Sequence, residues 1–221
     1  GTTGADLGFW AGARQSSDYQ RGEITVNTAS GHLQPYTTQQ TAELPQTEDG
    51  AYAPFFSAAD TKDPVNLTLE FGETEITATL TNLGNNNVLS TTYPFNRSTL
   101  TGEIGLHTET CSVLFDNLTV EVEPLSSFSR TWDFADTNAV SNFTNSRLHT
   151  QNNQLYLFTP GVEWYPSAAV LKEKLANPEN LESISVNIYR PVTGKARFYG
   201  GIYLGTTGGN LGVWAGSRRG V

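Results

Sequence analysis

The sequence predicts an all-β protein, an antiparallel β-sandwich or jelly roll, and two observations support this prediction. Short alternations of apolar and polar residues recur along most of the chain, and only 168–176 has a helix-like pattern. Clusters of Gly, Pro and Asn, such as 84–87 and 160–161, separate these alternations as turns do.

The clearest element is a β-hairpin predicted over 65–81. VNLTLEF at 65–71 places four apolar side chains on one face, ITATL at 76–80 repeats the alternation, and Gly72-Glu73-Thr74 connects them. The first half of 168–176 fits a strand as well as a helix. Long loops with one or two short strands are expected over 29–64, which is rich in Thr, Gln, Pro and Glu. Further strands are predicted at 6–14, 21–28, 103–107, 111–115, 117–123, 130–135, 147–150, 153–159, 166–172, 181–190, 195–205 and 210–218.

The inward positions of these alternations predict one shared hydrophobic core. Its expected members are Leu67, Leu69, Ile76, Ile104, Leu106, Val113, Phe115, Val120, Trp132, Phe134, Leu155, Leu157, Ile184, Val186 and Ile188.

Composition narrows the class of protein. A chain of 221 residues can form one large β domain or two small ones, and 37% hydrophobic with 16% charged residues indicates a globular protein. The net charge of −9 argues against nucleic acid and anionic membrane surfaces as partners. No apolar run approaches the ~18 residues that a membrane-spanning helix needs. The chain has no signal-peptide pattern and no Met, so we expect a processed, excised or internal piece of a longer precursor. Its single cysteine, Cys111, is expected to be a small buried hydrophobe.

A 14-residue segment occurs at both ends of the chain. GTTGADLGFWAGAR begins at Gly1 and GTTGGNLGVWAGSR begins at Gly205, with ten of fourteen positions identical at an offset of 204. Because this offset is the size of a domain, we interpret it as a long internal repeat rather than two similar hairpins, with 205–221 repeating 1–17. If a single sandwich has one strand position for this segment, the two copies compete for it. We therefore predict that one copy pairs with a strand of another chain. The alternative is that both copies occupy adjacent positions of one sheet in a monomer. The residues of this assembly strand are Leu7, Trp10, Leu211 and Trp214.

Two stretches resemble parts of a concanavalin A-like lectin/glucanase domain of the laminin G-like group. VNLTLEFGETEITATLTN, followed by TGEIGLHTETCSVLFDNLTVEV, resembles its last third. Such domains commonly close with a hairpin of this shape, a Gly-x-Ile-Gly-Leu strand (here 102–106) and a Phe-Asp-Asn-x-x-Val strand (here 115–120). RTWDFADTNAVSNFTNSRLHTQNNQLYLF, from Arg130, resembles the beginning of such a domain.

The resemblance implies that the chain is a permuted window on a tandem array. Residues 1–124 would be the C-terminal half of one module, 125–129 a linker, and 130–221 the N-terminal half of the next. Because domain termini tend to lie close together, the two halves could close within one chain. They could equally close between neighbouring chains, and the sequence leaves both routes open.

No catalytic constellation is evident in the sequence. Glycosidases of the resembled fold carry two carboxylates on one strand, typically Glu-x-Asp-x-x-Glu, and this spacing is absent. Glu73 with Glu75, and Glu121 with Glu123, are interpreted as solvated surface charges. There is no Gly-x-Ser-x-Gly, no Cys/His cluster for zinc and no phosphate-binding glycine loop. We therefore expect a protein that is not an enzyme.

The sequence suggests candidate residues for two kinds of binding site, a calcium site and a sugar site. Domains of the resembled group often hold a structural calcium ion, for which Asp133 and Asp136, with Asp116 from the last strand, are the candidate ligands. Turn formation by the same Asp residues is the simpler interpretation, and no other cofactor is predicted. Sugar binding needs exposed aromatic rings beside polar side chains. The candidates are Trp164, Tyr165, Tyr52 and Phe55, although packing in a core or interface is the simpler role for such rings.

The sequence thus favours a non-catalytic, extracellular or cell-surface module of a repetitive protein, which assembles head to tail with identical chains into a filament or surface array. The repeat, the missing catalytic constellation and the acidic, Thr- and Asn-rich composition support this hypothesis. The alternative is a carbohydrate-binding module of a secreted or surface protein.

Overall fold

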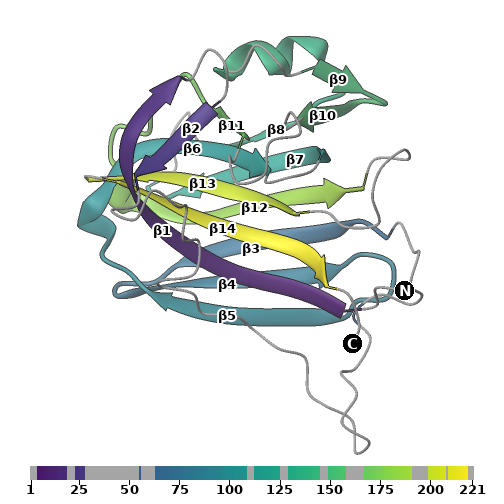
Figure 1. Ribbon diagram of the computed structural model, residues 1–221, viewed down its shortest axis with the longest axis horizontal. Coiled ribbons are helices and arrows are strands. Elements are labelled where there is room, and N and C mark those ends of the chain that lie inside the picture. The colour runs from purple at the N-terminus through teal and green to yellow at the C-terminus, as the bar shows by residue number, and fades with distance from the viewer. Residues whose placement is uncertain are drawn as a thin grey trace, which may run out of the picture.

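The computed structural model confirms the predicted fold class, since two antiparallel sheets pack face to face as in an all-β sandwich (Figure 1). The structure describes residues 4–18, 23–27, 55, 63–108, 112–124, 129–144, 149–157, 167–190, 199–207 and 209–218.

The first sheet closes on itself, because its first and last strands also pair with each other. Its strands, in spatial order, are β1 (Gly4–Asp18), β14 (Gly209–Arg218), β13 (Tyr199–Thr206), β6 (Leu100–Thr108), β11 (Ser167–Val170) and β2 (Glu23–Asn27).

The second sheet is open and packs its inner face against the first. Its strands, in spatial order, are β5 (Val88–Pro94), β4 (Glu75–Asn82), β3 (Val65–Phe71), β12 (Leu181–Tyr189), β7 (Val113–Val122), β10 (Gln154–Leu157) and β9 (His149–Gln151), with β8 (Arg130–Trp132) beside β7. Three short 3-10 helices connect strands: η1 (Arg97–Thr99), η2 (Thr137–Asn142) and η3 (Pro178–Asn180).

The two sequence segments on either side of 125–129 interleave in both sheets. In the first sheet β13 and β14 lie between β6 and β1, and in the second β12 lies between β3 and β7. Of the two closures that the sequence left open, the structure has the one within a single chain.

The predicted core is confirmed. All fifteen predicted side chains belong to one buried cluster, and none is more than 5% exposed. The alternation that predicted them is visible in β3, β4 and β12, where buried and partly exposed residues follow each other with period two.

The structure differs from the predicted elements in three places. The strands at 111–115 and 117–123 are the single strand β7, which is irregular near Asn117, where φ is +49° and the register with β12 shifts. The strand β5 was not predicted, since Leu89 is its only buried side chain and it ends in a proline, as an edge strand can. The helix-like stretch 168–176 begins as strand β11, because pairing with β6 outweighs its local helical preference.

The two copies of the repeated segment pair with each other as β1 and β14 (Figure 1). Phe9 lies opposite Val213, its own equivalent in the repeat, so the antiparallel pairing is symmetric about these two residues. The premise that the two copies compete for one strand position is therefore wrong, whereas pairing of a copy with another chain stays a prediction. The sheet has two adjacent strand positions, and the alternative with both copies in one sheet is the arrangement observed.

The symmetric pairing places each tryptophan opposite a glycine of the other copy, as Trp214 opposite Gly8 and Trp10 opposite Gly212. A Cβ on Gly8 would lie 2.8 Å from the Trp214 ring, so the glycine makes room for the indole. Leu7, Leu211 and Trp214 are buried, and the side chain of Trp10 lies outside the described residues.

Gly201 in β13 offers a test of this close packing. A Cβ at Gly201 would overlap the carbonyl oxygen of Val213 on β14, which is backbone and cannot rotate away. We expect Gly201→Ala to lower the free energy of unfolding by about 1–3 kcal/mol, measured by urea denaturation. The neighbouring Gly200→Ala is the control, since its Cβ would meet only side-chain atoms of Val113 and Phe115, at 3.1–3.2 Å. Equal losses for the two variants would contradict the backbone overlap.

Candidate functional site

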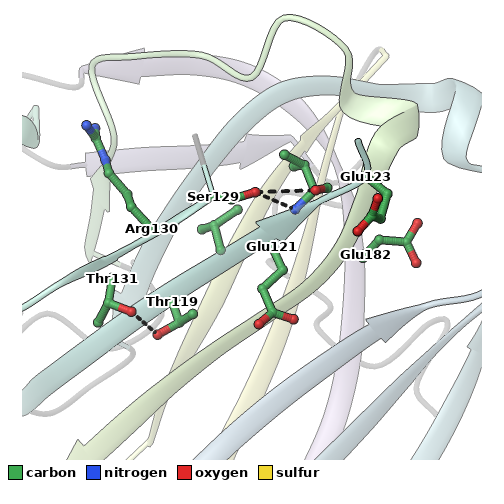
Figure 2. A pocket seen from close by; sticks show the side chains of 9 residues that line it. Thr119, Glu121, Glu123, Ser129, Arg130, Thr131 and Glu182 are labelled. Carbon is green, nitrogen blue, oxygen red and sulfur yellow. Dashed lines mark hydrogen bonds between the residues drawn. The ribbon is translucent and has the colours of Figure 1, made fainter. Parts of the chain in front are cut away.

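A groove of about 490 Å³ lies on the outer face of the second sheet, over β7, β8 and the beginning of β12 (Figure 2). Because side chains alternate along a strand, Val120 and Val122 of β7 point into the core while Thr119 and Glu121 point outward. Glu123, just after β7, and Glu182 of β12 add two further carboxylates to the lining.

Hydrogen bonds hold β8 and the residue before it against β7 at this groove. The Ser129 hydroxyl accepts from the Val122 N–H at 3.1 Å and donates to the Val122 carbonyl oxygen at 3.3 Å (Figure 2). The hydroxyls of Thr119 and Thr131 are 2.8 Å apart and bond across the same strand pair. Both contacts extend the pairing of β7 with β8 and fix the polar wall of the groove.

Three of the four charged side chains that line the groove, those of Glu121, Glu182 and Arg130, are engaged with neighbours. Glu121 accepts a hydrogen bond of 2.8 Å from the Ser183 hydroxyl. Glu182 pairs with Arg97 at 3.3 Å. Arg130 pairs with Glu173 at 2.9 Å, and its guanidinium carbon lies 4.5 Å from the centre of the Trp132 ring.

The lining of the groove offers mainly hydrogen-bonding groups. Among the lining residues there is no histidine, cysteine or lysine, and the Ser129 hydroxyl is committed to backbone bonds. Three carboxylates, three hydroxyls and one guanidinium can instead bind a polar ligand by hydrogen bonds.

Of the four aromatic residues predicted to bind sugar, only Phe55 is described. Phe55 is fully buried, and the amide nitrogens of Asn82, Asn85 and Asn87 donate to its carbonyl oxygen at 2.9, 3.1 and 3.2 Å. Its ring packs in the core and offers no exposed face, so the sugar-stacking role predicted for Phe55 is not supported. Trp164, Tyr165 and Tyr52 lie outside the described residues.

The same face carries two tyrosines that the sequence analysis missed, Tyr156 of β10 and Tyr189 of β12. Both are partly exposed, and both alternate with buried residues of their strands. The aromatic residues that the sequence suggested for sugar binding all lie in predicted loops. The alternation of inward and outward side chains along each strand could have identified them. Leu155 and Ile188 point into the core, so the residue after each of them must point outward.

The three aspartates predicted as calcium ligands all make local turn contacts. The Oδ1 atoms of Asp116, Asp133 and Asp136 each accept a hydrogen bond of 2.8 Å from a backbone N–H one or two residues later. Burial raises the pKa of Asp116, the Asn117 N–H opposes this, and the nearby charge of Asp133 raises the pKa further. The structure therefore brings Asp116 near Asp133, while Asp136 caps η2. No group of three or more metal-ligating side chains was found among the described residues, and a calcium ion stays a prediction.

No family model matches the chain, and no curated protein matches its sequence. The resemblance to concanavalin A-like domains therefore rests on the residues quoted above. In the part of the chain that the structure describes, no helix is long and apolar enough to cross a membrane.

Proposed function

We propose that this protein is a non-catalytic, extracellular structural or adhesive module that assembles head to tail by exchange of its repeated strand. The observation that carries the proposal is the symmetric pairing of β1 with β14, in which equivalent residues face each other. A segment that pairs with its own copy is complementary to the same segment in every other copy of the chain.

Exchange between chains would reproduce the contacts found within one chain. If β1 of one chain pairs with β14 of the next, Phe9 again faces Val213 and Gly8 again receives Trp214. The closed and exchanged forms then differ mainly in chain entropy and protein concentration, as in domain swapping. Reciprocal exchange gives a dimer, whereas head-to-tail exchange does not close and gives a filament.

The outer edge of β1 also favours association. Among the described strands, the second partner of β1 is β2, and that pairing begins only at Ala13. The segment before it, GADLGFWAG at 4–12, contains one charged residue, Asp6, and neither lysine nor proline. Proteins usually protect sheet edges with lysine, proline or bulges, so this composition is typical of a strand that pairs with another chain.

Disulfide trapping tests the exchange. Ala5 and Ser217 lie opposite each other in β1 and β14, and paired strands place Cα atoms ~4.5–5.5 Å apart, within reach of a disulfide. We expect Ala5→Cys with Ser217→Cys, in a Cys111→Ser background, to form a ladder of covalent oligomers when oxidised at high protein concentration. Dilution to equilibrium before oxidation should convert the ladder into internally bridged monomers, as seen on non-reducing gels.

The single variants Ala5→Cys and Ser217→Cys, in the same Cys111→Ser background, are the controls, because each can form at most a covalent dimer. A double variant that gives only internally bridged monomer at every concentration, together with a monomeric mass for the unmodified chain by light scattering, would refute strand exchange.

A further inference from the structure

The closed first sheet has an inner face that does not belong to the core between the two sheets. Because side chains alternate along a strand, the neighbours of its core residues point away from the second sheet. Among the described residues, the polar and aromatic side chains on this face are at most 7% exposed, although none belongs to the core cluster. We call this the enclosed face, and these members are Glu103, His107, Tyr203, Asn210 and Trp214.

His107 connects the enclosed face to the repeated segment. It lies in β6 opposite Gly201 of β13, and its Nε2 is 3.1 Å from the carbonyl oxygen of Val213 in β14. The imidazole therefore reaches across β13 to the next strand of the sheet. Gly201 leaves room for this contact, because a Cβ there would overlap the same carbonyl oxygen. The second copy of the repeat is thus bonded to β6 by a side chain that the closed sheet covers.

The enclosed face becomes open to water if the pairings that close the sheet break. The sheet returns to its start through β2, which pairs with β11 at one registered position, Ser167 with Glu23, and with β1 only over 13–18. Because these contacts are few, opening here costs less than unfolding the whole molecule. Strand exchange needs an opening of the same kind, since β1 must separate from β14 before either pairs with another chain. Either break admits water to His107.

Few titratable groups surround His107 among the described side chains. On β6 itself, Glu103 lies four residues away on the same face and pairs with Lys174 at 2.9 Å. β13 contributes Tyr203, whose hydroxyl donates to Asn210 of β14, and the sequence of β11, SAAV, contributes none. The other titratable residues of the first sheet have side chains outside the described residues, and they are Asp6, Arg14 and Asp18 of β1, Glu23 of β2, Tyr199 of β13 and Arg218 of β14.

The proton affinity of His107 depends on whether the sheet is closed. Burial lowers the pKa of His107 from 6.5 to about 4, and the bond to Val213 opposes only part of this effect. An open sheet exposes the ring to water and restores its ordinary pKa. Between the two values the open form binds a proton that the closed form does not, so acid favours opening. The open population then rises about twentyfold from pH 7 to pH 5.

We propose that protonation of His107 controls the rate of strand exchange, so that copies of this chain exchange β1 and β14 slowly at neutral pH and rapidly in mild acid. The inference rests on the assembly proposed above and adds its regulation. Acid changes the rate rather than the final ratio of monomer to oligomer, because the exchanged form contains the same contact between His107 and Val213. Return to neutral pH therefore traps the form that is present.

Hydrogen exchange and subunit mixing test opening and assembly separately. Hydrogen exchange of the β14 amides, followed by mass spectrometry and corrected for the intrinsic effect of pH, measures opening within one chain. Mixing of unlabelled with isotope-labelled chains, followed by native mass spectrometry, measures the formation of mixed oligomers. From pH 7 to pH 5 we expect both the opening constant and the mixing rate to rise about twentyfold.

His107→Gln is the matched variant, because its amide can still donate to the Val213 carbonyl oxygen but does not titrate. Its opening constant and mixing rate should change less than about threefold over this range. His149→Gln, at an exposed position, should behave as the unmodified chain does. If His107→Gln does not fold, NMR titration of the His107 ring replaces it, and a pKa near 6.5 in the folded chain overturns the inference.

The outcomes distinguish failure of the regulation from failure of the assembly. Mixing at the same rate at both pH values, or an equal acid response in folded His107→Gln, overturns the inference and leaves the assembly intact. Absence of mixed oligomers at both pH values refutes the assembly itself, and control of exchange with it. Equal protection of the amides of β14 and of β3 also overturns the inference, because opening would then be unfolding of the whole molecule.

Discussion

Replacing Leu69 by alanine is expected to lower the free energy of unfolding by about 2–5 kcal/mol. Leu69 is fully buried at the centre of the second sheet, opposite Ala78 of β4 and Ile184 of β12. The loss combines the apolar surface no longer buried with a cavity that strands paired on both sides cannot easily fill. Urea denaturation followed by circular dichroism measures it.

The neighbouring residue provides the control for Leu69. Glu70 is exposed on the opposite face of β3, and Glu70→Ala should change stability by less than about 0.5 kcal/mol. Because β3 joins one half of the chain to β12 of the other, the Leu69→Ala variant should unfold in a single transition. A loss below 1 kcal/mol, or separate unfolding of the two halves, would contradict a shared core.

The alternation of side chains predicted the core because it is a local property of each strand. Leu69 and Ile188 are recognisable as inward-facing without knowledge of their partners. Pairing between strands is different, because it depends on segments far apart in the sequence. Nothing near Phe9 indicates that its partner is Val213, and the repeat was therefore interpreted as two strands competing for one position. The edge strand β5, with a single buried side chain, leaves too weak an alternation to detect.

The candidate site was less predictable than the core for the same reason. Tyr156 and Tyr189 lie 33 residues apart in the sequence, and only their pairing with β7 places them on either side of Leu114. The groove likewise needs β8 and β12 on the two sides of β7. The alternation along a single strand shows which side chains face outward. The order of strands in the sheet decides which of these outward side chains become neighbours.

Stability is expected to fall by about 3 kcal/mol between pH 6.5 and pH 4 because of His107 alone. His107 is 1% exposed in β6, opposite Ala168 of β11 and Gly201 of β13, with its Nε2 3.1 Å from the Val213 carbonyl oxygen. Burial lowers the pKa of His107 from 6.5 to about 4, and the bond to Val213 opposes only part of this effect. Each unit of pKa corresponds to about 1.4 kcal/mol, which gives the expected loss.

The direction of this pH dependence follows from whether the folded or the unfolded state binds the proton on His107. Between pH 6.5 and 4 the unfolded chain protonates His107 while the folded chain keeps it neutral, so acid favours unfolding over this range. Below pH 4 both states are protonated and His107 contributes no further loss. Urea denaturation at several pH values should therefore show a decline that is about 3 kcal/mol smaller in His107→Gln, whereas replacement of the exposed His149 by Gln should leave the decline intact. If His107→Gln does not fold, titration of the His107 ring by NMR gives the same information, and a pKa near 6.5 in the folded protein would refute the prediction.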